Sequence, residues 1–132
     1  MIIAILQLLS ITLLTGLILH NYPNFLRALD KEDGSGAFDL AAVDILRDRE
    51  RGVPRYNRFR ELLGKERVKS FGEITSNVEW AGELREIYYD DIDRVDLMVG
   101  LFAEDLPEGF GFSDTAFRVF ILMASRRLKS DA

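Results

Sequence analysis

The chain has 132 residues and no cysteine, which leaves room for one modest hydrophobic core and excludes disulfides, cysteine-ligated zinc and cysteine nucleophiles. Its formal net charge of -5 argues against a nucleic-acid-binding surface, which needs excess positive charge to meet phosphates. Charge is also unevenly distributed, because all 17 basic and 22 acidic residues lie at or after Arg27. The beginning of the chain therefore resembles a buried or lipid-embedded segment, and the rest resembles a solvated helical protein.

The uncharged beginning, residues 1–19, is predicted to form an apolar helix. Its length is just sufficient to cross the hydrocarbon core of a bilayer. It lacks the basic start and the small-residue cleavage site of a secretory signal peptide, so that interpretation is discounted and the localisation stays undetermined. Two alternatives remain, a membrane helix and a helix buried inside a larger protein. The exceptions to its apolar character are Gln7, Ser10, Thr12, Thr15 and Gly16.

Beyond an amphipathic piece that starts at Pro23, residues 31–36 contain two glycines and predict a turn or linker. Asp39 is then placed to cap a helix, which Gly52 and Pro54 end in the expected order. A shorter helix is expected from Tyr56 until Gly64 ends it. No segment alternates with period two for long enough to predict a strand. We therefore expect an all-α chain.

Capping residues also indicate where the later helices begin. Ser70 and Ser76 each have a glutamate three residues on, which is the spacing of a capping box. Asp93 is expected to start a helix that continues through Leu101. Ser113 is expected to cap the last helix. Its apolar stripe is formed by Phe117, Phe120, Ile121, Ala124 and Leu128.

General searches for catalytic and binding motifs return little. The single histidine, His20, has no second ligand or catalytic partner of its own type and is assigned a capping or packing role. The acidic run at Asp90 lacks the glycine and terminal glutamate of a calcium loop, so a helix start explains it better. The arginines between Arg47 and Arg60 alternate with acidic residues, which is typical of a solvated, salt-bridged face.

One face of a predicted helix does not fit the interpretation as a solvated, salt-bridged surface. Leu40, Asp44 and Arg47 are spaced i, i+4 and i+7, so they share one stripe of the helix that Asp39 caps. A carboxylate and a guanidinium therefore point towards whatever Leu40 packs against. A buried charge pair at such a place needs a reason, such as a cofactor or a partner.

Three segments in order, FDLAAVDILRDRERGVPRYN (38–57), DRVDLMVGLFAE (93–104) and FRVFILMASRRL (117–128), resemble the C-terminal part of haem peroxidases of the animal type. That superfamily includes the cyclooxygenases, and the motif RDRER (47–51) is most similar to the fatty-acid α-dioxygenase branch. The resemblance implies the helical C-terminal portion of a haem-peroxidase-like fold, incomplete here. Residues 20–132 are accordingly expected to be a fragment of a haem peroxidase or dioxygenase domain, with residues 1–19 as the apolar helix before it.

The resemblance also implies site residues. The helix that carries Leu40, Asp44 and Arg47 would pass beneath the proximal face of the haem. The position of Asp44 is commonly an asparagine that accepts a hydrogen bond from the proximal histidine, and the position of Arg47 commonly meets a haem propionate. A carboxylate at Asp44 would hold the imidazole N–H more strongly and favour ferric and higher oxidation states of iron. Arg47 would neutralise a propionate through a charge-assisted hydrogen bond.

In that family the distal and proximal histidines lie upstream of these segments. The sequence around His20 does not resemble the proximal motif, because Leu17 stands where oxygenase members carry a radical-forming tyrosine. The resemblance implies haem, a fatty-acid or peroxide substrate and a link to oxidative stress, but this chain alone is expected neither to retain haem nor to catalyse. Its expected partner is an upstream haem-bearing chain or a second copy of itself. Binding to nucleic acid is not expected. The alternative is a non-catalytic helical protein that either binds a partner or is anchored to a membrane through residues 1–19.

Overall fold

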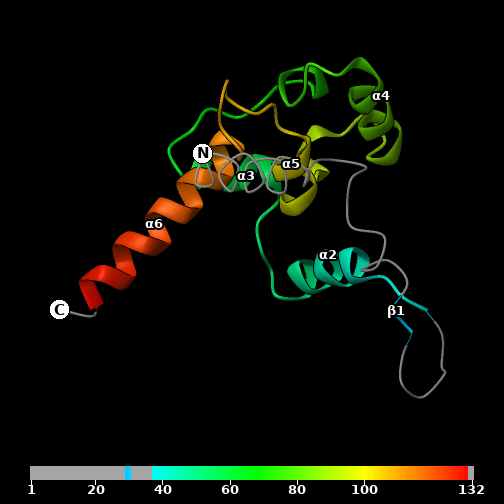
Figure 1. Cartoon of the computed structure of the whole chain (residues 1–132). Helices are drawn as coiled ribbons and strands as arrows, with labels where there is room; N and C mark the ends of the chain where they lie inside the picture. Colours follow the sequence, from blue (N-terminus) through cyan, green and yellow to red (C-terminus); the bar gives the residue numbers. More distant parts are fainter. Residues whose placement is uncertain (1–28, 31–36, 131–132) are drawn as a thin grey trace, which may run out of the picture.

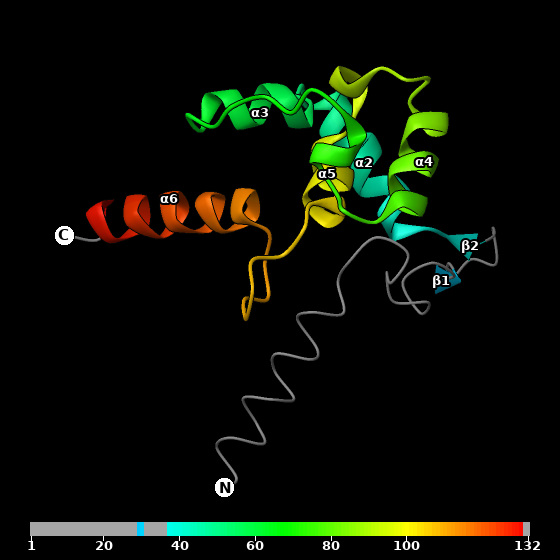
Figure 2. The same ribbon diagram turned by 90° about the horizontal axis from the view of Figure 1, so that it is seen from above.

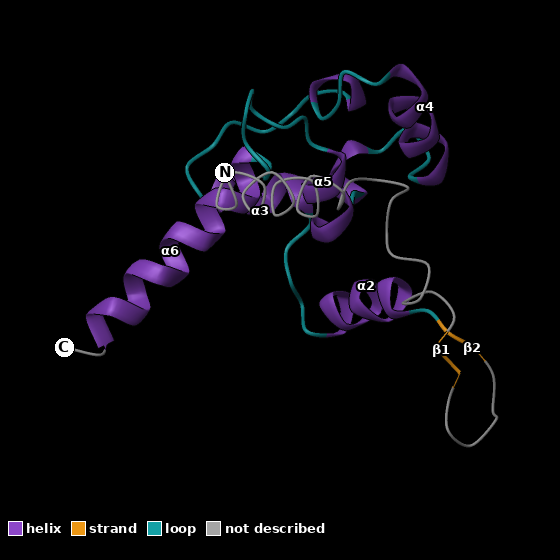
Figure 3. Cartoon of the chain, viewed as in Figure 1, coloured by secondary structure: helices purple, strands orange, loops and turns teal. Residues whose placement is uncertain are grey.

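The structure, a computed structural model, describes residues 29–30 and 37–130 of the chain (Figure 1). Its elements are mostly helical (Figure 3). In chain order they are β1 (Leu29–Asp30), β2 (Ala37–Phe38), α2 (Leu40–Glu50), α3 (Tyr56–Leu62), the 3-10 helix η2 (Phe71–Glu73), α4 (Val78–Ile87), the 3-10 helix η3 (Ile92–Arg94), α5 (Leu97–Ala103) and α6 (Asp114–Ser130). The prediction of a helical fold is confirmed for this part of the chain.

One short pair of strands was not predicted. Leu29 pairs with Phe38 and Asp30 pairs with Ala37 in an antiparallel register. The two strands enclose residues 31–36, where a turn or linker was expected and which lie outside the described residues. The apolar stretch 1–19 and His20 lie outside them as well.

The helices α2 and α3 begin and end as the sequence predicted. Asp39 caps α2, since its side chain accepts a hydrogen bond from the Ala42 N–H at 3.1 Å. Gly52 follows the helix with a φ of 70°, a left-handed conformation that glycine adopts without steric cost. Gly64 has the same role after α3, with a φ of 73°.

Two predicted helix starts were wrong by a few residues. Asn77, not Ser76, caps α4, because its side-chain oxygen accepts hydrogen bonds from the Glu79 and Trp80 N–H groups at 3.0 and 3.2 Å. The helix expected from Asp93 is divided into two, η3 and α5, which meet at Asp96. Asp96 makes no capping bond of its own, because its side chain is turned towards other partners.

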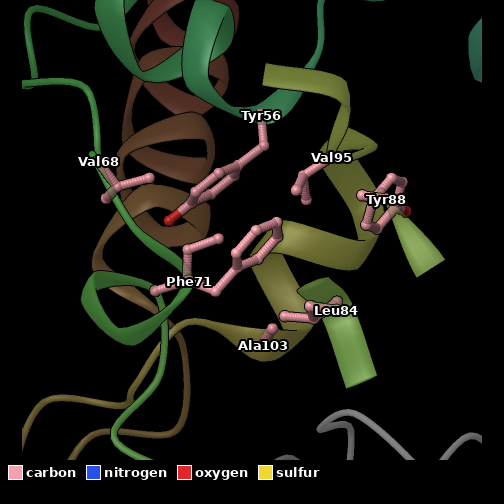
Figure 4. Close-up of a cluster of buried hydrophobic side chains, with 8 residues drawn as sticks. Tyr56, Val68, Phe71, Leu84, Tyr88, Val95 and Ala103 are labelled. Carbon is pink, nitrogen blue, oxygen red and sulfur yellow. The ribbon is translucent and has the colours of Figure 1, made fainter. Parts of the chain in front are cut away.

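The hydrophobic core lies where α3, η2, α4 and α5 meet (Figure 4). Tyr56 is completely buried, and the close-up shows its ring with Val68, Phe71 and Val95 around it. α3 and α5 can pack this closely because Gly100, on α5, has no side chain facing Tyr56. Asn57 is also buried and holds the Val68 backbone through two hydrogen bonds of 2.9 Å, one to the carbonyl and one from the N–H. The core therefore includes polar groups that are fully paired.

The last helix, α6, begins as predicted and then leaves the core. The Ser113 hydroxyl accepts a hydrogen bond from the Ala116 N–H at 3.4 Å. The C-terminal half of α6 extends away from the other elements in two perpendicular views (Figures 1 and 2). Its expected apolar stripe is largely exposed, with Phe120 at 63% and Leu128 at 74%. No helix among residues 37–130 is long and apolar enough to span a bilayer.

Candidate functional site

The candidate site on α2 has an acidic and a basic side chain, Asp44 and Arg47, on one face of the helix. Arg47 Nη1 lies 3.7 Å from Asp44 Oδ1, one turn away on the helix, and the two side chains are 52% and 40% exposed. This separation exceeds a hydrogen bond, so the guanidinium keeps donors available for another anion. The buried pair that the spacing suggested is therefore half-exposed in the described chain, where Leu40 is only partly buried.

Asp44 and Arg47 also line a hollow of about 520 Å³. Leu40 is not part of its wall, so the structure brings only two of the three candidate residues together around this space. The α2 side is charged, and the opposite side, from α5 and the loop before α6, is mainly apolar. The apolar wall contains Leu97, Met98, Leu101, Phe102, Leu106 and Phe112. The α2 wall holds two carboxylates, of Asp44 and Asp48, and two guanidinium groups, of Arg47 and Arg51. The hollow therefore suits a ligand that has both an apolar face and charged groups.

A second charged cluster is centred on Asp96, whose side chain is 5% exposed. Arg49 binds it in a bidentate manner, with Nε to Oδ1 at 2.9 Å and Nη2 to Oδ2 at 2.6 Å. Arg55 donates to Oδ1, and the Tyr88 hydroxyl donates to Oδ2 at 3.0 Å. This cluster joins α2 and the segment before α3 to α4 and α5. Its carboxylate is fully paired, which is typical of a structural group.

Burial and hydrogen bonding shift the pKa of Asp96 in opposite directions. Burial disfavours the charged carboxylate of Asp96, but hydrogen bonds from Arg49 and Tyr88 outweigh it, so its pKa lies below the usual 3.8. The pKa of Tyr88 rises to about 12, mainly because the hydroxyl is buried. Tyr88 is therefore a neutral donor at physiological pH.

A third cluster is formed around Glu104, at the end of α5. Arg60 and Lys65 lie 3.1 and 3.2 Å from its Oε1, and all three side chains are at most 13% exposed. Lys65 also donates to the Thr115 hydroxyl at 3.0 Å and pairs with Asp114 at 2.6 Å. These contacts attach the start of α6 to the end of α3. The cluster is thus a polar anchor for the last helix.

Sequence reasoning missed both buried clusters. Arg49 and Arg55 lie 47 and 41 residues from Asp96 along the chain, so no local periodicity reports their pairing. The one available signal was an acidic residue inside the apolar run 95–103. The prediction of a salt-bridged arginine stretch holds, but several of its partners are distant and buried rather than local and solvated.

The clusters predict how stability depends on pH. The pKa values of Asp93, Asp96 and Asp114 all lie below the usual 3.8, the first because Asn57 donates a hydrogen bond and the last because Lys65 does. Folded-state pKa values below the unfolded ones mean that the unfolded chain binds protons first as pH falls. Urea denaturation should therefore show full stability above about pH 5 and a progressive loss as the pH falls below that value. A free energy of unfolding that stays constant down to about pH 3 would contradict this assignment.

Residues able to hold a metal or perform imidazole chemistry are limited. Within residues 29–30 and 37–130 no group of three or more histidine or acidic side chains could hold a metal ion. The sole histidine of the sequence, His20, is outside these ranges. The described residues thus offer a charged and apolar wall, and no histidine.

Comparison with known proteins finds matches over most of this chain. The family model of animal haem peroxidases matches residues 7–132. Alpha-dioxygenase 2 of Arabidopsis thaliana is 50% identical over 87% of this chain, and the match covers 19% of that protein. The crystal structure of fatty acid α-dioxygenase from Oryza sativa superposes with a TM-score of 0.78 at 50% identity, covering 86% of this chain and 19% of its own. Peroxidase A from Dictyostelium discoideum gives a TM-score of 0.62 at 34% identity, over 66% and 17% of the two chains.

The resemblance seen in the three sequence segments is therefore confirmed, together with the helical fold that it implied. The chain spans about a fifth of the length of the α-dioxygenases that it matches. It belongs to the animal haem peroxidase family, whose members depend on haem, and corresponds to a part of the α-dioxygenase type.

Proposed function

We propose that this chain supplies the proximal-side wall of the haem pocket in a fatty-acid α-dioxygenase-type oxidoreductase, and that it is inactive by itself. Asp44 accepts the hydrogen bond of the proximal histidine, and Arg47 pairs with a haem propionate. Leu40 packs beside them on the same face. Both the histidine and the remaining pocket come from the part of the domain that this chain does not contain.

The observation that carries this proposal is the half-exposed pair of Asp44 and Arg47 beside an apolar wall. Haem has a flat apolar face with two carboxylates at one edge, which matches the chemistry of the hollow. Arg47 can form a charge-assisted bond with a propionate because its contact to Asp44, at 3.7 Å, is longer than a hydrogen bond. The described residues fit the periphery of the cofactor, and its iron needs a ligand from elsewhere.

The family match also bears on the apolar beginning of the chain. It starts at residue 7, so most of the stretch 1–19 aligns with the haem peroxidase domain. This alignment favours the interpretation of that stretch as part of the larger domain rather than as a separate membrane anchor. When bound, the haem would supply the redox chemistry, and the residues of this chain would orient its ligand and balance its charge.

Haem titration of a reconstituted mixture tests the proposal. The chain is mixed with Oryza sativa α-dioxygenase from which the matched region has been deleted, and the Soret absorbance is followed. We expect no Soret band from the chain alone and a band from the mixture. Asp44→Ala and Arg47→Ala should each weaken haem affinity by about tenfold, as loss of a ligand-orienting group typically does.

The matched control is an ion pair with the same i, i+3 spacing on the next helix, α3. Arg58 and Glu61 are exposed and lie one turn apart on α3, so Arg58→Ala and Glu61→Ala should leave the haem affinity unchanged. Asp44→Asn gives a second readout, since weakening the carboxylate bond to the histidine should raise the reduction potential of the iron. Equal haem affinity in the Asp44→Ala/Arg47→Ala double variant and the unmodified chain would refute the proposal.

A further inference from the structure

A second hollow, of about 540 Å³, is lined by residues of α2, α4, η3 and α5. We call it the α4 hollow, and it shares no lining residue with the hollow beside Asp44 and Arg47. Its apolar wall contains Ile45, Leu84, Ile87 and Val99. Its charged wall contains Arg49, Arg55 and Arg94 together with the carboxylates of Glu83 and Asp96. A cavity of this size with an apolar wall and a few convergent charged groups is typical of a small-molecule site.

Two of the arginines keep hydrogen-bond donors for a further anion. Arg49 uses Nε and Nη2 for Asp96, and Arg55 uses Nη1. Each guanidinium has more N–H groups than these bonds take. Because the Arg49 and Arg55 side chains are 50% and 40% exposed, their remaining donors can reach a ligand in the hollow.

Arg94 is the third arginine of this wall. Its guanidinium lies over the Tyr89 ring, 5.7 Å from the ring centre. Such a contact uses the face of the guanidinium and leaves the N–H donors in its plane available. Among the described residues Arg94 makes no ion pair. The charged wall therefore holds three guanidinium groups against two carboxylates, and both oxygens of Asp96 are already bonded to arginines.

Tyr89 has a backbone conformation that favours glycine. The end of α4 is a Schellman motif, in which the Tyr89 N–H bonds to the Glu86 carbonyl at 3.3 Å and the Asp90 N–H bonds to the Arg85 carbonyl at 2.8 Å. Tyr89 occupies the left-handed position of the motif, with a φ of 55°, which is strained for a bulky side chain. Its ring is 81% exposed, so burial does not offset the strain. Strain of this kind often marks a functional position.

We propose that the α4 hollow binds an amphipathic anion, an aliphatic body that ends in a carboxylate or a phosphate. The oxyanion accepts charge-assisted hydrogen bonds from Arg94 and from the donors that Asp96 leaves free on Arg49 and Arg55. The aliphatic body covers the apolar wall, where Ile87 is 64% exposed, and the Tyr89 ring covers its rim. The proposal is independent of the haem contact, because the two hollows have different residues.

Isothermal titration calorimetry of the full chain tests the proposal. The probes are octanoate, octyl phosphate and 1-octanol, each below the concentration at which it forms micelles. We expect both anions to bind at least about tenfold more tightly than the uncharged alcohol, which lacks the charge-assisted hydrogen bonds. Tighter binding of octanoate assigns a carboxylate ligand to the hollow, and tighter binding of octyl phosphate assigns a phosphate.

Two substitutions probe the wall without removing any group of the Asp96 cluster. Arg94→Gln should weaken binding of the tighter anion by about tenfold. Tyr89→Gly should weaken it by about threefold or more, through lost apolar contact. The midpoint of urea denaturation should stay the same or rise in Tyr89→Gly, because glycine adopts this φ without strain. Arg85→Gln is the matched control, since Arg85 is an exposed arginine of α4 that does not line the hollow, and it should leave the affinity unchanged.

Three results would overturn the proposal. The first is equal affinity for 1-octanol and the two anions, or no heat of binding from either anion at two temperatures. The second is an equal loss of affinity in Arg94→Gln and Arg85→Gln, which would indicate unspecific attraction to a basic surface. The third is binding that depends on Arg47 instead of Arg94, which would place the anion in the hollow beside Asp44.

Discussion

Replacing Gly100 with alanine is expected to destabilise the fold by about 3 kcal/mol, at the upper end of the usual cost of overpacking a core. A methyl group on Gly100 would overlap the Tyr56 ring at Cγ and Cδ2 and come within 2.8 Å of Tyr56 Cβ. The ring cannot move aside, because Tyr56 is 0% exposed and its N–H is bonded to the Val95 carbonyl at 2.9 Å. The helices α3 and α5 would have to separate.

The free energy of unfolding from urea denaturation measures this effect, and Gly82 provides the control. Gly82 lies within α4, and a methyl group there would meet no atom within 4 Å. Gly82→Ala should therefore stabilise the chain by about 0.5–1 kcal/mol through helix propensity. If the two substitutions change stability in the same direction and by similar amounts, close packing at Gly100 is not what joins α3 to α5.

Replacing Asp96 with alanine is expected to cost a similar amount, about 3 kcal/mol, the lower end for removing one partner of a buried ionic cluster. Two guanidinium groups and the Tyr88 hydroxyl would lose their shared acceptor. The cost stays at the lower end because Arg49 and Arg55 are 50% and 40% exposed and can turn towards water. Loss of the cluster should detach α2 from α4 and α5.

Asp90→Asn is the matched control for this experiment. Asp90 pairs with Arg85 on the surface, where the two side chains are 78% and 58% exposed, so its loss should change stability by no more than about 0.5 kcal/mol. Asparagine also tolerates the left-handed φ of 59° at this position. Equal stability of the Asp96→Ala and Asp90→Asn variants would remove Asp96 from the groups that hold the helices together.

Much of the fold followed from local sequence signals. Asp39 before an apolar-periodic segment and Gly52 after it define α2 correctly, because capping and left-handed backbone are decided by residues close in sequence. The start of α4 was misplaced by one residue, since Ser76 and Asn77 are both good caps. Asp96 divides the expected helix from Asp93 because long-range arginines hold its side chain. Contacts between residues so far apart in the chain produce no periodic pattern in the sequence.

The candidate site was predictable in part. The shared face of Asp44 and Arg47 follows from helix geometry, and the structure places them 3.7 Å apart. Their exposure did not follow from the sequence, since the amphipathic pattern records the environment of the complete domain. The same reason explains α6, whose stripe reads as a core face in the sequence but is open in this chain. The chain covers only 19% of the solved Oryza sativa α-dioxygenase, so most of that protein has no counterpart among these 132 residues.

Oxygen uptake with palmitic acid is the measurement that tests the central claim most directly. The chain, the matched-region-deleted Oryza sativa α-dioxygenase and haem are assayed separately and together. Our account predicts no oxygen uptake by the chain with haem, and uptake by the complete mixture that falls when Arg47→Ala replaces the unmodified chain. Oxygen uptake by the chain and haem alone, or by the deleted enzyme and haem without the chain, would contradict it.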